Sequence, residues 1–189
     1  MKKIGIFGGT FDPWHIGHET IVENAFKSLE LDEIIIVPTT VNYYRPDKRY
    51  LFVFNEKVQI IQNFITGSNR KISIDTVEKD KDGNWRTIDL VKYFSNKFPN
   101  DDKLYLIIGE DSYKEFKTWS QWKDILNYVE LAVANRSSKI DDVSWKSDVP
   151  AVAINMGDKF EDCSATRVRN KLIEELIDMY LSDKEWYSQ

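Results

Sequence analysis

The fold is decided by residues 8–18, GGTFDPWHIGH, which lie between a short apolar run, Lys3–Phe7, and an amphipathic run, His18–Leu29. The first run is too short for an ordinary helix and contains β-branched and aromatic residues, which favours a buried strand. The second run places apolar residues at helical spacing and therefore predicts a helix with one buried face. Residues 8–18 thus form a turn that leads from a strand into a helix.

The alternation of strand and helix continues along the chain. Because strands alternate with helices, we expect right-handed crossovers and a parallel sheet that is covered on both faces. The interpretation is a single α/β domain over residues 1–189 with a Rossmann-like, doubly wound parallel sheet. Further strands are expected at Glu33–Pro38, Lys71–Asp75, Leu104–Ile108, Tyr128–Ala134 and Ala151–Asn155, further helices at Val53–Ile65, Thr87–Phe98 and Ala165–Leu181, and loops at Thr39–Tyr50, Lys79–Asn84 and Asn135–Val149.

Composition narrows the class of protein. Of 189 residues, 42% are hydrophobic and 30% are charged, which is typical of a globular domain. The formal net charge of −5 argues against an extended surface for nucleic acids or anionic membranes. The single cysteine, Cys163, excludes an intramolecular disulfide, and no apolar stretch approaches the roughly 18 residues of a membrane span. We expect a cytoplasmic protein without nucleic-acid or membrane partners; the sequence does not indicate its oligomeric state.

The turn itself points to a phosphorylated ligand. In an open parallel sheet such a turn lies at the carboxyl end of a strand, where ligands bind. Gly8 and Gly9 would let a phosphate approach the backbone closely, and the start of the following helix would offer N–H groups and partial positive charge. The stretch fits neither the dinucleotide-binding G-x-G-x-x-G pattern nor a P-loop.

Both histidines of the chain, His15 and His18, fall within this turn. Zinc sites on helices usually pair H-x-x-x-H with a third ligand, but here there is no third histidine and the cysteine is distant. A structural role at the helix N-terminus stays open. The sharper hypothesis is that both imidazoles contact phosphate oxygens, because nucleotidyl transfer mainly requires positioning and stabilisation of anionic charge.

Residues 8–18 resemble the H-x-G-H signature of the nucleotidyltransferase superfamily, in the version found in bacterial nicotinate-mononucleotide adenylyltransferases. The resemblance implies transfer of AMP from ATP to nicotinate mononucleotide, which gives nicotinate adenine dinucleotide and pyrophosphate. It implies Mg²⁺ held largely by the ATP phosphates, with no metal site built by the protein. By the same resemblance, His15 and His18 are catalytic, and Gly8, Gly9, Thr10 and Phe11 bind ATP.

Other matches extend the implied ATP site. Residues 164–169, SATRVR, resemble an S-S-T-x-I-R segment that binds the ATP phosphates, although a capped helix with surface arginines is the simpler alternative. Gly109 and Asp111 match a G-x-D that contacts the ribose, where Asp111 could instead cap a helix. The residues implied to bind ATP in these segments are Ser164, Thr166, Arg169, Gly109, Asp111 and Arg136.

Three residues match positions that the resemblance implies to bind the mononucleotide: Lys48, Thr87 and Trp119. Lys48 could instead be a solvated loop lysine, and Trp119 could be a core residue. Glu78 keeps the spacing of an acidic residue of the family. Residues 85–91 resemble S-Y-T-I-D-T-L, but Arg86 stands at the tyrosine position and adds a positive charge near the expected pyridine substituent. Asp47 likewise replaces a family histidine.

These departures leave the acceptor open. The alternatives are nicotinamide mononucleotide, both mononucleotides, phosphopantetheine, or a nucleotide-binding module without turnover. Because the ligands would be polyanions and the chain is acidic, the basic residues should converge on one crevice; these are His15, His18, Lys48, Arg136 and Arg169.

Overall fold

Six parallel strands form one sheet in the order β3-β2-β1-β4-β5-β6. The structure is a computed structural model that describes residues 1–40, 50–80, 85–135, 148–156 and 166–175. The all-parallel sheet in this order confirms the predicted Rossmann-like α/β fold. The strands are β1 (Lys3–Gly9), β2 (Glu33–Pro38), β3 (Ile72–Ile74), β4 (Lys103–Gly109), β5 (Glu130–Asn135) and β6 (Ala151–Asn155).

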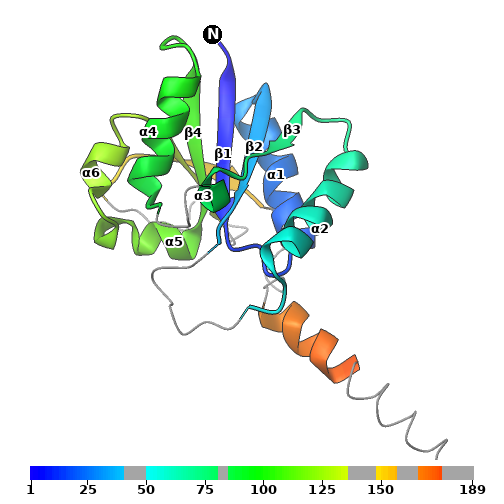
Figure 1. The fold of residues 1–189 in the computed structure, drawn as a ribbon. Helices are drawn as coiled ribbons and strands as arrows, with labels where there is room; N and C mark the ends of the chain where they lie inside the picture. The colour runs from blue at the N-terminus through cyan, green and yellow to red at the C-terminus, as the bar shows by residue number, and fades with distance from the viewer. Residues whose placement is uncertain (41–49, 81–84, 136–147, 157–165, 176–189) are drawn as a thin grey trace, which may run out of the picture.

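Helices cover both faces of the sheet, as Figure 1 shows. In Figure 1, α1 and α2 lie on one side of the central strands, and α4 and α6 lie on the other. No helix in the described part of the chain is both long and apolar enough to cross a membrane. The helices are α1 (Ile16–Leu29), α2 (Phe54–Thr66), α3 (Val77–Asp80), α4 (Thr87–Lys97), α5 (Glu110–Lys114), the 3₁₀ turn η1 (Phe116–Thr118) and α6 (Trp122–Ile125), and residues 166–175 are also helical.

Two buried apolar clusters, one on each face, hold the helices to the sheet. On one face Phe94 of α4 packs in a cluster with Ile4 and Ile6 of β1. On the other face Phe26 of α1 and Ile61 of α2 pack in a cluster with Phe7. Because successive strand residues point to opposite faces and both faces are buried, the central strands are apolar runs without alternation.

The structure differs from the expected element boundaries at a few places. Lys79 and Asp80 were expected in a loop but belong to α3, whose four residues are too few to produce a helical periodicity. The fifth strand begins at Glu130, because Tyr128 and Val129 still donate hydrogen bonds to Ile125 at the end of α6. Of the predicted C-terminal helix, Ala165–Leu181, the structure describes residues 166–175, and these are helical.

The reversal of strand order places a crevice between β1 and β4. β1 pairs with β2 on one side and with β4 on the other, and Phe7 is registered opposite Ile107. The carboxyl ends of these two strands, Gly8-Gly9 and Ile108-Gly109, therefore lie next to each other. Ligands of open α/β sheets bind at such a switch point.

Candidate active site

The first turn is fixed by a reciprocal cap between the two histidines. His15 is the N-cap of α1, and its Nδ1 accepts a hydrogen bond from the backbone N–H of Gly17 at 3.1 Å. His18 Nδ1 in turn accepts from the backbone N–H of His15 at 3.2 Å. This is the arrangement of a capping box, with imidazole nitrogens in the roles of the usual oxygen acceptors.

The cap determines which imidazole nitrogen can contact a ligand. Because Nδ1 of each ring accepts a hydrogen bond, the neutral ring carries its proton on Nε2. Both residues are only half-buried. Each Nε2–H is therefore the group that could donate to an anionic oxygen near the start of α1.

Aromatic side chains hold the His18 ring in place. It stacks on Trp14 at a centroid distance of 5.1 Å and on His15 at 3.8 Å. The edge of Phe11 meets it at 5.0 Å and 89°. Phe11 adopts φ 45°, a conformation rare for side-chain-bearing residues, while its ring is 3% exposed within the core. The packing thus limits the ring orientations that His18 can adopt.

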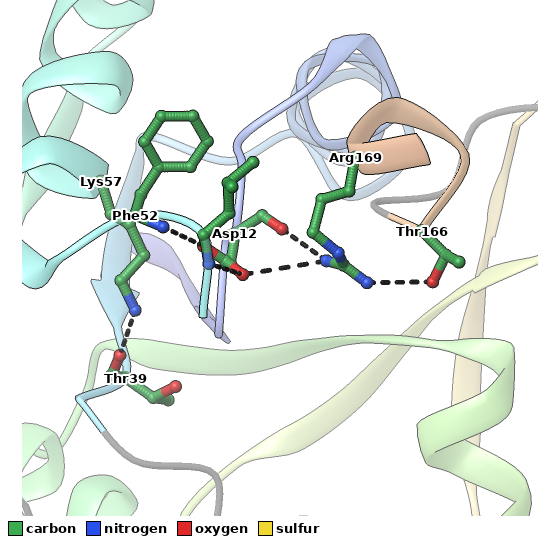
Figure 2. Close-up of polar contacts among 7 residues, drawn as sticks. Asp12, Thr39, Phe52, Lys57, Thr166 and Arg169 are labelled. Atoms are coloured by element: carbon green, nitrogen blue, oxygen red, sulfur yellow. Dashed lines mark hydrogen bonds and ion pairs between the residues drawn. The ribbon is translucent and has the colours of Figure 1, made fainter. Parts of the chain in front are cut away.

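Asp12 ties the first turn to two distant segments, as Figure 2 shows. Its side chain is buried, and its carboxylate accepts hydrogen bonds from the backbone N–H groups of Leu51 and Phe52 at 2.9–3.1 Å. Arg169 donates to the backbone carbonyl of Asp12 at 2.6 Å and lies 3.9 Å from its carboxylate. Arg169 also donates to the Thr166 hydroxyl at 3.0 Å. The helix of residues 166–175 thereby meets the first turn.

A cavity of about 780 Å³ lies at the carboxyl end of the sheet. One side is formed by Gly8, Gly9 and Thr10 of the first turn. The other side, called here the α4 wall, combines residues before and at the start of α4 with residues around the end of η1. The α4 wall consists of Trp85, Arg86, Thr87, Thr118, Trp119 and Ser120, and Thr39, Glu78, Leu90, Leu106, Ile108 and Ser112 complete the lining.

Glu78 is a buried acid in the lining of this cavity. Burial raises the pKa of its carboxyl from 4.5 to about 7, while a hydrogen bond from the Thr40 backbone and the positive charge of Lys57 oppose the rise. Lys57 is itself 2% exposed, and its ammonium donates to the Thr39 carbonyl at 2.9 Å. The Thr39 hydroxyl is also buried and has no hydrogen-bond partner among the described residues. Near neutral pH this side of the cavity therefore carries less negative charge than its sequence suggests.

A family model described as cytidylyltransferase-like matches residues 6–171, which include both the first turn and Arg169. The chain belongs to the cytidylyltransferase-like family. A relative in Fusobacterium nucleatum, named a probable nicotinate-nucleotide adenylyltransferase, is 32% identical over 174 residues, which cover 90% of this chain and 87% of the relative. The nicotinate-nucleotide adenylyltransferase of Bacillus subtilis is 28% identical, with 99% of both chains covered. The chain is thus identified with the nicotinate-nucleotide adenylyltransferase branch of this family.

Structural comparison agrees on the fold. The nicotinic acid mononucleotide adenylyltransferase of Plasmodium falciparum, solved in complex with NaAD, superposes with a TM-score of 0.71 at 21% identity. The match covers 90% of this chain and 83% of that one. The match shows that the two chains share the arrangement of strands and helices.

The cavity brings together residues from both predicted halves of the family site. Gly8, Gly9 and Thr10, predicted to bind ATP, line it together with Thr87 and Trp119, predicted to bind the mononucleotide. Trp119 is half-buried and also packs against Phe116 at 5.3 Å. Trp119 therefore packs against the core and also lines the cavity. Ligand contact at these positions stays a prediction.

Other predicted residues are not part of the cavity lining or lie outside the described residues. Gly109 ends β4 at the switch point, and a Cβ there would meet nothing within 4 Å. Asp111 is exposed on α5, and the neighbouring Glu110 carboxylate pairs with Lys114 at 2.7 Å. Thr166 is exposed and holds Arg169. The predicted positions Lys48, Arg136 and Ser164 lie outside the described residues, so their expected convergence with His15, His18 and Arg169 stays a prediction.

Sequence reasoning missed Asp12 and Lys57 as organising residues. In the sequence Asp12 is only one residue of the motif, because its partners Leu51 and Phe52 are 39 and 40 positions away. Lys57 lies on the otherwise apolar inner side of α2, where a charge is unexpected. A charged residue inside an amphipathic pattern was the available signal for Lys57, since such residues are rarely buried without a partner.

A magnesium ion that arrives with ATP stays a prediction. Within the described ranges, no three His, Cys, Asp or Glu side chains are grouped so that they could hold a metal ion. The first turn offers hydrogen-bond donors more than carboxylates. Mg²⁺ usually keeps several waters and binds through substrate phosphates with few protein ligands.

Proposed function

We propose that this enzyme transfers AMP from ATP to nicotinate mononucleotide and releases pyrophosphate. One observation carries the proposal: the start of the first turn, Gly8–Thr10, lines the same cavity as the α4 wall, and the two imidazoles that follow in the turn are ordered by the cap of α1. The named relatives support the same substrates, because they are nicotinate-nucleotide adenylyltransferases. The acceptors are small molecules, and we expect the reaction to run in the cytoplasm.

The chemistry requires charge stabilisation more than a protein nucleophile. An oxygen of the mononucleotide phosphate attacks the α-phosphorus of ATP, a new P–O bond forms, and the bond to the bridging oxygen of pyrophosphate breaks. Negative charge grows on the leaving pyrophosphate during this step. His15 and His18 would donate from Nε2 to phosphate oxygens, and the cap through Nδ1 would hold both rings ready for it.

Arg169 and the bound metal would supply the remaining positive charge. A guanidinium can donate two parallel hydrogen bonds to phosphate oxygens, and Arg169 lies at the first turn. Mg²⁺, when bound with ATP, would neutralise phosphate charge and polarise the α-phosphate. Gly8, Gly9 and Thr10 would contact the nucleotide through the backbone at the end of β1.

An acceptor panel tests the proposal. Purified protein, ATP and Mg²⁺ are offered nicotinate mononucleotide, nicotinamide mononucleotide or phosphopantetheine, and pyrophosphate release is followed. We expect the highest kcat/KM with nicotinate mononucleotide and one dinucleotide formed for each pyrophosphate. Release without dinucleotide would indicate hydrolysis. No release with any acceptor would support a nucleotide-binding module without turnover.

A further inference from the structure

Arg86 occupies a position that is unfavourable for an arginine in the absence of a ligand. It is the N-cap of α4, a position where side chains that accept hydrogen bonds are preferred, and its side chain makes no cap hydrogen bond. Its positive charge also lies at the end of the helix that is already partially positive. The sequence adds that Arg86 stands where the resembling segment has tyrosine. A residue that violates local preference in this way often serves a ligand.

The side chain of Arg86 is directed along the α4 wall. One guanidinium nitrogen donates to the hydroxyl of Ser120 at 2.9 Å, and Ser120 follows Trp119 directly. Arg86, Trp119 and Ser120 all line the cavity. The Ser120 bond therefore holds the guanidinium at the residue that follows Trp119, on the cavity that both residues line.

The charges around Arg86 leave it able to bind an anion. Asp89 accepts from the backbone N–H of Arg86 at 3.0 Å and partly balances the helix end. In the part of the chain that the structure describes, no carboxylate pairs with the Arg86 guanidinium. Glu78, the acid in the same lining, has a pKa raised to about 7 by burial, which lowers its negative charge near neutrality. Arginine presents five N–H donors, and the bond to Ser120 uses one of them.

We propose that the Arg86 guanidinium binds the carboxylate on the pyridine ring and makes the enzyme select nicotinate over nicotinamide mononucleotide. This inference rests on the proposed function. The two acceptors differ only in that substituent, and a carboxylate accepts stronger, charge-assisted hydrogen bonds from a guanidinium than an amide does. The amide of nicotinamide carries N–H donors of its own. These cannot pair with the N–H donors of Arg86, so some donors at this contact would stay without a hydrogen bond.

The test compares the two acceptors in wild type and in Arg86→Gln. We expect KM for nicotinate mononucleotide to rise about tenfold in Arg86→Gln, because one exposed charge-assisted contact is lost. The value of kcat should change little, since the substituent is remote from the phosphate that reacts. The KM for nicotinamide mononucleotide should stay within about twofold, so the preference for the acid falls about tenfold.

Two further variants separate recognition from a general effect of charge. Arg86→Lys retains the charge without the planar fork and should keep a preference between those of wild type and Arg86→Gln. Lys123→Gln removes an exposed positive charge from the neighbouring helix α6 and should leave the preference unchanged. An unchanged preference in Arg86→Gln, or an equal loss in Lys123→Gln, would overturn the inference while leaving the proposed function intact. If wild type adenylates neither mononucleotide, the proposed function itself fails, and this inference fails with it.

Discussion

The first turn and the α4 wall differ in how their side chains are held. In the first turn, His15 and His18 are fixed by backbone hydrogen bonds within the turn and by rings packed against them. In the α4 wall, Arg86 is exposed and is held by one hydrogen bond to Ser120 from a separate segment. Under the two proposals above, the first turn would perform the reaction on any acceptor, and the α4 wall would decide which acceptor is used.

The largest expected effect is a loss of turnover when a residue of the first turn is substituted. His18→Ala should lower kcat by about 100- to 1,000-fold, which is the usual cost of losing one ordered donor to a transition state. The reduction should be the same with both mononucleotides, because the proposal places His18 at the ATP phosphates and not at the pyridine ring. Steady-state pyrophosphate release measures it.

His18→Asn distinguishes the catalytic role of His18 from its capping role. The asparagine oxygen can still accept from the backbone N–H of His15, so the helix start should stay more stable than in His18→Ala. We expect turnover to fall in both variants, with circular dichroism like that of wild type. Near-normal turnover in either variant would refute the role assigned to His18.

The second effect is on the pH dependence of stability, and it concerns Glu78, which lines the same cavity as the α4 wall. Because its pKa is about 7 in the folded protein and near 4.5 when unfolded, the folded state binds the proton more tightly. Glu78 therefore makes its full contribution to the free energy of unfolding below pH 4.5. That contribution falls as the pH rises from 4.5 through 7, by about 3 kcal/mol in total.

The variant Glu78→Gln isolates this contribution, since glutamine keeps the shape and does not titrate. We expect urea unfolding at pH 5 and pH 8 to show a loss of stability in wild type that is about 2.5 kcal/mol larger than in the variant. Equal losses in the two proteins would mean that Glu78 ionises in the fold as it does in the unfolded chain.

The smallest expected effect is a rise in KM for ATP when Arg169 is substituted. Arg169→Ala should raise KM for ATP about tenfold, and by more than it raises KM for the mononucleotide, because its guanidinium is proposed to bind ATP phosphates. Arg167→Ala, an exposed arginine on the same helix, serves as the matched control and should change KM for ATP less. If the mononucleotide KM rises more, Arg169 has been assigned to the wrong ligand.

The fold could be predicted from sequence because its signals are local. A central strand such as Glu33–Pro38 is buried on both faces and is therefore an uninterrupted apolar run. The four-residue α3 gave no such signal, because a single turn is too short to show periodicity. Short helices near the cavity depend on tertiary packing more than on their own pattern.

The candidate site could be predicted only in part. The first turn was found because its residues are contiguous, and the three-residue spacing of His15 and His18 is also the spacing of a capping box. The contacts of Asp12 with Leu51 and Arg169 join segments far apart in the chain, so no local pattern predicts them. The sequence shows that Arg86 departs from the tyrosine of the family segment. Only the hydrogen bond to Ser120 shows where the Arg86 side chain points.

The central claim is that the first turn performs the reaction and the α4 wall selects the acceptor. It is tested most directly by measuring kcat/KM for both mononucleotides in four proteins. These are wild type, His18→Ala, Arg86→Gln and the double variant. We predict that His18→Ala lowers both values by one factor and keeps their ratio, that Arg86→Gln reduces the ratio, and that the double variant shows the product of both effects. A ratio that changes in His18→Ala as much as in Arg86→Gln would contradict the account.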